Sequence, residues 1–145
     1  MHPNVNQYTR SGAAPARAVG TGETLIGITF MDDAITQRMG GAPVQVVSPC
    51  EGTGFEIAGM SIVKGARNLA AAKKFYDWAL SPAGQNIGID ANALQIPSNR
   101  NARIHPQAPR LETLTLIQYD FGRFGSTAER ERLLTRFGRD VRGGS

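Results

Sequence analysis

The chain has 145 residues, of which 41% are apolar and 19% charged, and it carries a net charge of +4. This length suits one domain, and the balance of apolar and charged residues excludes an intrinsically disordered chain. A single cysteine, Cys50, excludes an internal disulfide and any cysteine-rich metal site. No stretch approaches the roughly 20 apolar residues of a membrane span, and no basic-then-apolar signal sequence opens the chain.

The first predicted element is a helix at residues 13–19. Pro15 is tolerated in the first turn of this helix because its missing N–H would have no partner there anyway. Ser11 is the predicted N-cap. Gly20 or Gly22 should end the helix, since glycine takes the left-handed conformation without a steric penalty.

The start of this helix is a candidate anion site. The Ser11 side chain and the unpaired N–H groups of Gly12, Ala13 and Ala14 would converge on one point, where the helix dipole adds about half a positive charge. Such a point attracts phosphate and carboxylate groups. The alternative is a purely structural cap, which is the ordinary role of a serine before a helix.

A strand is expected at residues 25–30, whose nearly continuous apolarity is typical of a strand covered on both faces. Asp32 and Asp33 follow its carboxyl end. Ligands of open α/β sheets collect at that end of the strands, so these carboxylates could face the same cleft as the anion site. The alternative is that they cap a short helix expected at residues 34–39.

Two further strands are expected, at residues 44–47 and 55–63. The first is rich in β-branched valines, which fit a pleated surface, and the second alternates in part. Cys50 and Glu51 lie in the proline- and glycine-containing loop between them.

The clearest helical pattern follows Asn68, the predicted N-cap of a helix with an apolar stripe. Phe75 and Trp78 of this helix are predicted to belong to the core. Ser81-Pro82 should end the helix and at once begin a short second one that ends near Gly88, because serine at the N-cap and proline at the next position strongly favour a helix start.

The carboxyl-terminal third gives weaker signals. Residues 111–119 are apolar enough to be buried, but their period does not separate helix from strand. Ser126 and Glu129 have the spacing of a capping box and predict a last helix. The arginines that follow alternate with glutamates and apolar residues, which is typical of a solvated amphipathic helix, so we expect no nucleic-acid binding.

No motif predicts an enzyme. The chain has no nucleophile paired with a base, no Walker loop and no glycine-rich dinucleotide motif. His2 and His105 have no second ligand-type residue at metal spacing, so we interpret both as surface histidines. We therefore expect no catalytic residues, no metal and no cofactor.

Several short motifs follow one another in an informative order: Ser11-Gly12, Gly22-Glu23, Ile26-Gly27-Ile28, Pro49-x-Glu51-Gly52, Lys64-Gly65-Ala66-x-Asn68, Ala71-Ala72-Lys73-x-Phe75 and Ser81-Pro82-x-x-Gln85. In this order the chain resembles the carboxyl-terminal part of the periplasmic solute-binding proteins of ATP-binding-cassette (ABC) importers. The similar branch holds ferric-ion, sugar-phosphate and aminophosphonate binders. The likeness runs from residue 8 to about residue 99 and is most specific at residues 64–85.

The resemblance implies an α/β fold of the periplasmic-binding-protein type II-like kind, present in part as the end of the second lobe plus return helices. Residues 1–62 would form the end of ligand-binding lobe 2, as helix, strand, helix, strand and strand. Residues 63–145 would form a return segment whose carboxyl-terminal helices pack on the missing lobe 1. The arbitrary start at Met1 and the ending Gly143-Gly144-Ser145 agree with a fragment.

The resemblance also implies a function, namely capture of a solute in the periplasm and its delivery to an ABC permease of the inner membrane. Iron-binding members place adjacent tyrosines where this chain has Phe30-Met31-Asp32-Asp33, so a small anionic solute such as a phosphate ester or phosphonate is favoured. The implied ligand residues are Ser11, Gly12 and Ala13 for the anion and Asp32 for the polar end of the ligand.

Three more residues are candidates for the site. Tyr8 and Arg10 could flank the anion, and Glu51 could line the hinge between the lobes. The alternatives are a packed aromatic ring, a solvated charge and an ordinary turn glutamate.

Two other functions stay open. The chain could be a ferric-ion carrier with Asp32, Asp33 and Tyr8 as ligands, or an interaction module whose basic last helix docks on an acidic partner. Without the first lobe, apolar surfaces at residues 64–88 would be exposed, so pairing of two copies of the fragment is also expected.

Overall fold

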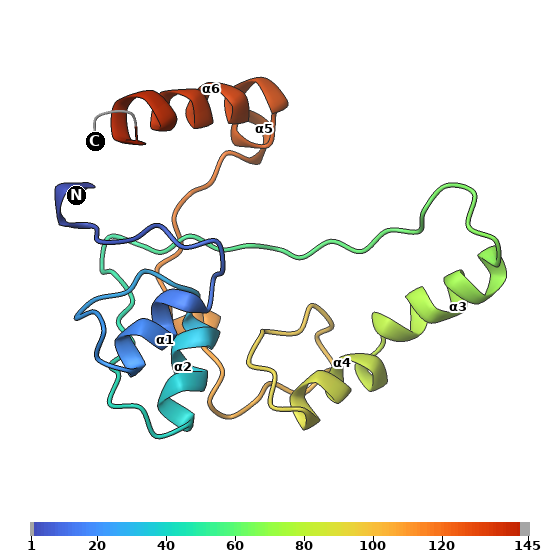
Figure 1. The fold of residues 1–145 in the computed structure, drawn as a ribbon. Helices are drawn as coiled ribbons and strands as arrows, with labels where there is room; N and C mark the ends of the chain where they lie inside the picture. The colour runs from blue at the N-terminus through green and yellow to red at the C-terminus, as the bar shows by residue number, and fades with distance from the viewer. Residues whose placement is uncertain (1, 143–145) are drawn as a thin grey trace. The chain divides into compact units, whose positions relative to one another are not determined.

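The computed structural model describes residues 2–142, so Met1 and Gly143-Gly144-Ser145, the ends at which a cut was expected, lie outside the described residues. Its elements are α1 (Ala14–Gly20), α2 (Met31–Met39), α3 (Leu69–Ala79), α4 (Pro82–Asp90), α5 (Phe121–Phe124) and α6 (Thr127–Phe137), with the short turns η1 (His2–Asn4), η2 (Leu111–Thr113) and η3 (Gly138–Arg142) (Figure 1). No helix among the described residues combines the length and apolarity needed to cross a membrane.

The chain folds into two units, each made of separate segments. The central unit comprises residues 9–48 and 56–114, and the terminal unit comprises the described part of segments 1–8, 49–55 and 115–145. The candidate anion site and helices α1 to α4 belong to the central unit, and α5 and α6 belong to the terminal unit.

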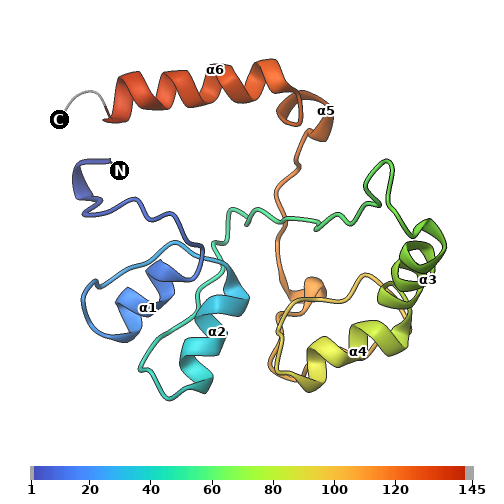
Figure 2. The ribbon, with the colours of Figure 1, turned by 45° about the vertical axis from the view of Figure 1, so that its right-hand side comes forward.

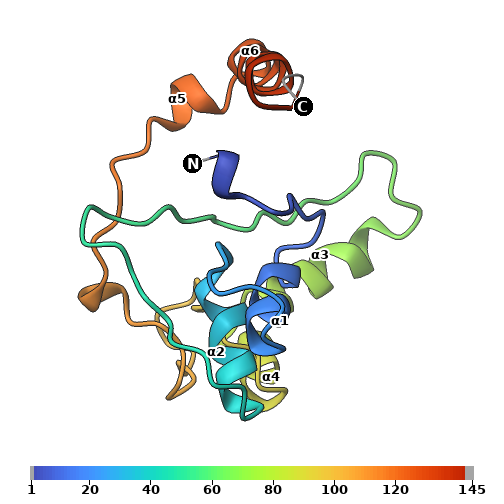
Figure 3. The same cartoon turned by 60° about the vertical axis from the view of Figure 1, so that its left-hand side comes forward.

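Helices α1 and α2 lie side by side in the central unit (Figure 3). Ala16 of α1 and Ile35 of α2 are each only 4% exposed, and with Leu94 and Ala108 they form the buried apolar core of the described residues. Gly22, with φ of +77°, lets the chain turn back after α1, as expected of a glycine beyond a helix end. The predicted first helix is thus confirmed to within one residue.

The predicted N-cap of this helix is wrong. The N-cap is Ala13, and no side chain caps the helix. The Ser11 carbonyl instead accepts a 3.3 Å hydrogen bond from the Ala14 N–H. The physical reason is that a main-chain turn precedes the helix and places the Ser11 hydroxyl two residues too early to cap it.

The strands predicted at residues 25–30, 44–47 and 55–63 are also wrong as local assignments. These segments form no ladder, and an isolated parallel bridge between Thr53 and Leu116 is the sole β pairing in the described part of the chain. Figure 1 shows residues 56–63 as an extended run of chain that leads into the turn before α3. A strand needs a neighbour to accept its backbone hydrogen bonds, and the described residues place none beside these segments.

The two helices predicted after Asn68 are confirmed (Figure 2). The Asn68 side chain accepts a 3.1 Å bond from the Ala71 N–H, and the Ser81 hydroxyl accepts a 3.2 Å bond from the Gly84 N–H. A Cβ on Gly84 would overlap the Trp78 carbonyl oxygen, so the tight junction between α3 and α4 requires glycine there. Helix α4 runs two residues beyond the predicted end near Gly88.

The prediction that Phe75 and Trp78 belong to the core is wrong. Phe75 is 61% exposed and Trp78 is 44% exposed. Their rings lie against each other with centroids 5.5 Å apart. The apolar stripe of α3 therefore exists as a surface, and the described residues do not cover it.

The terminal unit brings two distant segments together around Thr53. Its N–H donates to the Thr115 carbonyl at 2.8 Å, and its carbonyl accepts from the Ile117 N–H at 3.1 Å. Gly52, with φ of +118°, has a backbone conformation that other residues rarely adopt, and a Cβ there would lie 3.1 Å from the Ile117 side chain. Residues 111–119, where the sequence did not separate helix from strand, are thus one short 3-10 turn followed by a single bridge.

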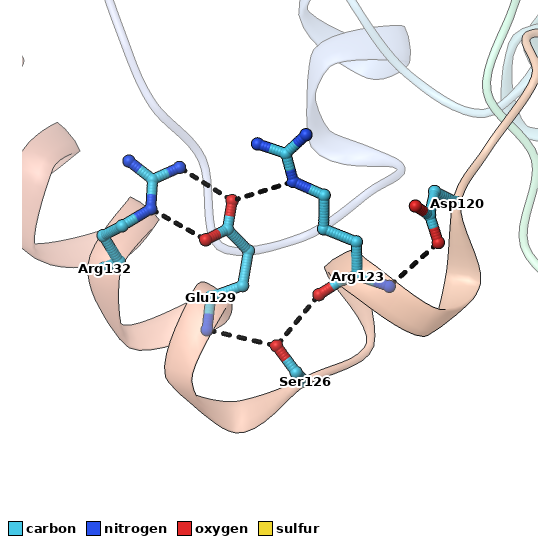
Figure 4. Close-up of polar contacts among 5 residues, drawn as sticks. All are labelled: Asp120, Arg123, Ser126, Glu129 and Arg132. Carbon is cyan, nitrogen blue, oxygen red and sulfur yellow. Dashed lines mark hydrogen bonds and ion pairs between the residues drawn. The ribbon is translucent and has the colours of Figure 1, made fainter.

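Helix α6 begins as predicted at Ser126, whose hydroxyl accepts a 3.3 Å bond from the Glu129 N–H (Figure 4). The reciprocal half of the capping box is absent, because both Glu129 carboxylate oxygens accept 2.7 Å bonds from Arg132. The Glu129 carboxylate also lies 3.7 Å from Arg123. The hydrogen bonds from Arg132 lower the pKa of Glu129, and desolvation opposes this shift.

Candidate functional site

The structure brings the turn before α1 next to the segment that leads into α2. The Thr29 hydroxyl donates a 2.5 Å hydrogen bond to the Gly12 carbonyl. A Cβ built on Gly12 would lie 2.8 Å from the Phe30 ring and 3.6 Å from an Asp33 carboxylate oxygen. The two sequence stretches predicted to share a site are therefore neighbours, and any side chain at position 12 would displace the ring.

The main-chain donors of this turn differ in availability. The Ala14 N–H is already bonded to the Ser11 carbonyl, so the prediction that it converges on an anion is wrong. The N–H groups of Gly12 and Ala13 donate to no acceptor within residues 2–142. Helix α1 has only seven residues, so these two free amides and the exposed Ser11 hydroxyl, more than the helix dipole, are the groups that an anion could use.

Asp32 lies in the first turn of α2, where a carboxylate is favoured by the positive end of the helix. Its carboxylate accepts a 2.7 Å hydrogen bond from the side-chain amide of Gln95. Its carbonyl accepts a 2.8 Å bond from the Thr36 hydroxyl. The side chain is thus held by a residue far along the chain, and the described residues give it no role as a cap.

Gln95 is the site residue that the sequence reasoning missed. It lies in the stretch after α4 where secondary-structure signals fade, and nothing in its local pattern indicates a partner 63 positions earlier. Only the folded backbone reveals this contact.

Asp33 has a raised pKa, first because it is partly buried and second because Asp32 repels its charged form, while Arg17 opposes the shift. The unfolded chain releases this proton near the ordinary value of 3.8, so the free energy of unfolding decreases as pH rises from there through the raised pKa. An ionised Asp33 would repel an anion at the Gly12 turn, whereas a protonated Asp33 could donate to it.

The remaining candidates are divided between the two units. Arg10 is exposed in the central unit. Tyr8 and Glu51 belong to the terminal unit. The Tyr8 hydroxyl lies 3.1 Å from the His2 ring nitrogen Nδ1, and its ring meets Phe137 edge-on at 5.5 Å, which agrees with the reading of a packed aromatic.

Glu51 is exposed beside Cys50, whose thiol donates a 3.3 Å bond to its carboxylate. Its own backbone N–H and, second, this thiol lower the Glu51 pKa. The carboxylate is therefore engaged locally, as in the reading of an ordinary turn glutamate.

Two observations bear on the alternative functions. Within residues 2–142, no group of three or more His, Cys, Asp or Glu side chains is arranged to hold a metal ion. On the basic last helix Arg132 pairs with Glu129, and Arg136 of this helix and Arg139 of η3 pair with Asp140 of η3. These pairs reduce the positive charge available for an acidic partner.

A family model described as bacterial extracellular solute-binding protein matches residues 1–123. An uncharacterized protein of Haemophilus influenzae is 45% identical over 143 residues, which is 98% of this chain and 41% of that protein. The chain therefore spans less than half the length of this curated relative.

Two solved structures are similar in sequence and fold. The periplasmic binding protein AfuA from Actinobacillus pleuropneumoniae, with exogenous fructose-6-phosphate bound, is 46% identical with a TM-score of 0.90, over 97% of this chain and 44% of that one. The periplasmic binding protein P5PA is 32% identical with a TM-score of 0.77, over 97% of this chain and 45% of that one.

These similarities confirm the predicted resemblance to the carboxyl-terminal part of an ABC-importer solute-binding protein and the predicted fold class, a partial α/β fold of the type II-like kind. The chain belongs to the bacterial extracellular solute-binding protein family.

Proposed function

We propose that this protein is the solute-binding component of an ABC importer, that it works in the periplasm, and that its solute is a small phosphorylated compound of the sugar-phosphate class. The observation that carries the proposal is the 46% identity and TM-score of 0.90 to AfuA, a protein whose structure contains fructose-6-phosphate. Binding would be followed by delivery to a permease, without chemical conversion.

The Gly12 turn supplies the groups that suit the phosphate. The free N–H groups of Gly12 and Ala13 and the hydroxyl of Ser11 are donors of the kind that bind phosphate oxygens. Arg10 is exposed in the same unit and could add two parallel hydrogen bonds. We assign these four residues to the anionic end of the solute.

The carboxylate of Asp32 suits the polar end of the solute. It accepts from Gln95 through one oxygen, which leaves further acceptor capacity for sugar hydroxyls. The Gln95 bond fixes the orientation of the carboxylate before a ligand arrives. Such preorganisation lowers the cost of ordering the site on binding.

The proposal keeps residues 1–62 as the end of ligand-binding lobe 2, residues 63–145 as the return segment, and Tyr8 and Glu51 as further candidates. In this family closure of two lobes would hold the solute, and ligand contacts in both lobes would favour the closed form. Because the chain covers 44% of AfuA, we expect the chain alone to bind weakly.

The test is ligand-detected nuclear magnetic resonance on the 145-residue chain with millimolar fructose-6-phosphate, fructose or inorganic phosphate. We expect fructose-6-phosphate to bind, phosphate to compete with it, and fructose to bind at least tenfold more weakly. Asp32→Asn should weaken fructose-6-phosphate binding at least about tenfold, since hydrogen bonds to charged groups contribute about 1.5–3 kcal/mol. Glu56→Gln, an exposed carboxylate change in the same unit, is the matched control.

Equal binding of fructose and fructose-6-phosphate, or no binding of either, would contradict the proposal. A visible charge-transfer band on addition of ferric citrate would favour the ferric-ion carrier instead.

A further inference from the structure

The carboxylate of Asp33 lies beside the turn whose main-chain donors are free. One of its oxygens is 3.6 Å from the position that a Cβ on Gly12 would occupy. Its neighbour Asp32 is bonded to Gln95, whereas the Asp33 side chain has no ion pair or hydrogen bond within residues 2–142. A carboxylate that is engaged by no other residue therefore stands next to a turn that is expected to hold an anion.

The turn and the start of α2 are held together, so this proximity is a fixed feature of the fold. The Thr29 hydroxyl donates to the Gly12 carbonyl at 2.5 Å. The Phe30 ring fills the space beside Gly12, and the Phe30 carbonyl accepts a 3.2 Å bond from the Ala34 N–H at the start of α2. Asp33 follows three residues after Phe30, in the first turn of the same helix.

The charges around Asp33 come from three elements. Asp32 on its own helix repels the charged form, and Arg17 on α1 attracts it, while partial burial is the largest cause of the raised pKa. Arg10 is the charged residue of the turn before α1, and residues 91–99, which reach α2 through Gln95, hold no charged residue. This carboxylate therefore accepts a proton more readily than an ordinary aspartate does.

A carboxylate beside an anion site distinguishes anions by whether they carry a proton. An anion without a proton is repelled by the charged carboxylate, whereas an anion with an O–H group can donate that proton in a hydrogen bond to it. We propose, building on the proposed function, that Asp33 determines the specificity of the anion site. Its carboxylate accepts a hydrogen bond from a P–OH group, so the site selects the singly protonated form of a phosphate monoester.

This proton has two consequences that can be measured. Phosphate monoesters lose their last proton near pH ~6, whereas a sulfate ester has no proton to lose near neutral pH. At pH 6 the protonated phosphate ester and the sulfate ester both carry one negative charge, so the proton is the difference between them. At higher pH, binding must take up one proton from water, so the affinity for the phosphate ester should fall with rising pH.

The experiment is ligand-detected nuclear magnetic resonance on the 145-residue chain with fructose-6-phosphate or fructose-6-sulfate between pH 6 and pH 8.5. The sulfate ester should bind at least tenfold more weakly than the phosphate ester at pH 6. The affinity for fructose-6-phosphate should fall by up to about tenfold for each pH unit above pH ~6.5, as expected for uptake of one proton. The affinity for the sulfate ester should change less than threefold over the same range.

Two variants test whether Asp33 is the group that accepts the proton. Asp33→Asn replaces the acceptor with an amide that can donate to an unprotonated oxygen. This variant should bind the two esters within about threefold of each other at pH 6, and its affinity for fructose-6-phosphate should not fall with pH. Asp77→Asn makes the same change at an exposed carboxylate of α3 in the same unit and is the matched control, which should keep both the preference and the pH dependence.

The outcomes separate this proposal from the proposed function. Binding of fructose-6-phosphate with an affinity that does not depend on pH, or equal binding of the sulfate ester, would overturn the role of Asp33 alone. A folded Asp33→Asn variant that keeps the preference for phosphate would do the same. Absence of fructose-6-phosphate binding at every pH would overturn the proposed function and this role with it. If the variant loses its helical circular dichroism signal, the two measurements on the parent chain decide the question.

Discussion

The central unit contains two kinds of segment that the sequence predicted as regular structure. One kind is the helices α3 and α4, and the other is the extended segments at residues 25–30 and 56–63. The helices are present with the predicted caps, whereas the segments form no ladder within the described residues. A helix satisfies its backbone within a few residues, as in the bond from the Ala71 N–H to Asn68. A strand depends on a neighbour, which can lie anywhere in the chain or in another one.

The comparison also shows that a helix can satisfy its backbone hydrogen bonds without burying one of its faces. The exposed fraction of Phe75 on α3 is similar to that of many side chains in the extended segments. Helix α3 therefore forms without a buried face. Helices of about 11 residues are marginal in water without tertiary packing. Local caps and the small core around Ile35 should therefore account for much of the stability of the central unit.

The largest expected effect comes from the core. Ile35→Ala should lower the free energy of unfolding of the central unit by about 2–5 kcal/mol, because it removes buried methyl groups and leaves a cavity. Ile57→Ala, at a position that is 76% exposed, should change it by less than about 0.5 kcal/mol. Urea unfolding followed by circular dichroism measures both. Similar effects at the two positions would show that residue 57 is covered in solution.

A smaller effect is expected from the cap of α3. Asn68→Ala should destabilise the helix by about 1 kcal/mol, since the first-turn amide of Ala71 loses its acceptor. Asn68→Asp keeps an acceptor and is the matched control. Hydrogen exchange of the Ala71 amide should become about fivefold faster in the alanine variant alone. Unchanged exchange would mean that packing against other residues, and not the cap, stabilises α3.

The contrast between local and long-range hydrogen bonds explains how much of the fold the sequence could predict. Ser81, Ser126 and Asn68 act within three residues of their own positions, and their helices begin where predicted. Ser11 has the same residue type, but a turn intervenes and the helix begins later. The strand predictions identified chain that is extended and apolar, yet pairing depends on residues that the local pattern does not contain.

The candidate site follows the same rule. The sequence indicated that the Gly12 turn and the carboxylates after residue 30 could share a site, and the structure has Gly12 and Asp33 as neighbours. Only α1 and the extended segment at residues 25–30 separate them along the chain. The sequence could not find Gln95, whose contact with Asp32 spans 63 positions. The sequence also could not decide whether Tyr8 binds the solute or packs within the fold. The residues that contact its hydroxyl and its ring lie near the two ends of the chain. Long-range contacts are set by tertiary packing and leave no periodic signal.

The smallest effect tests a purely local pair. The pKa of Glu129 is lowered in the folded chain, chiefly by its hydrogen bonds from Arg132, so stabilisation of α6 is present above its ordinary value of 4.5 and is lost as pH falls through the lowered pKa. Glu129→Gln should remove this acid-induced loss of helix, while Glu131→Gln on the same helix should keep it. Amide chemical shifts of residues 127–137, followed from pH 6 to about pH 2, measure the change. Because the two residues of the pair lie three positions apart on one helix, this titration should not depend on the rest of the chain.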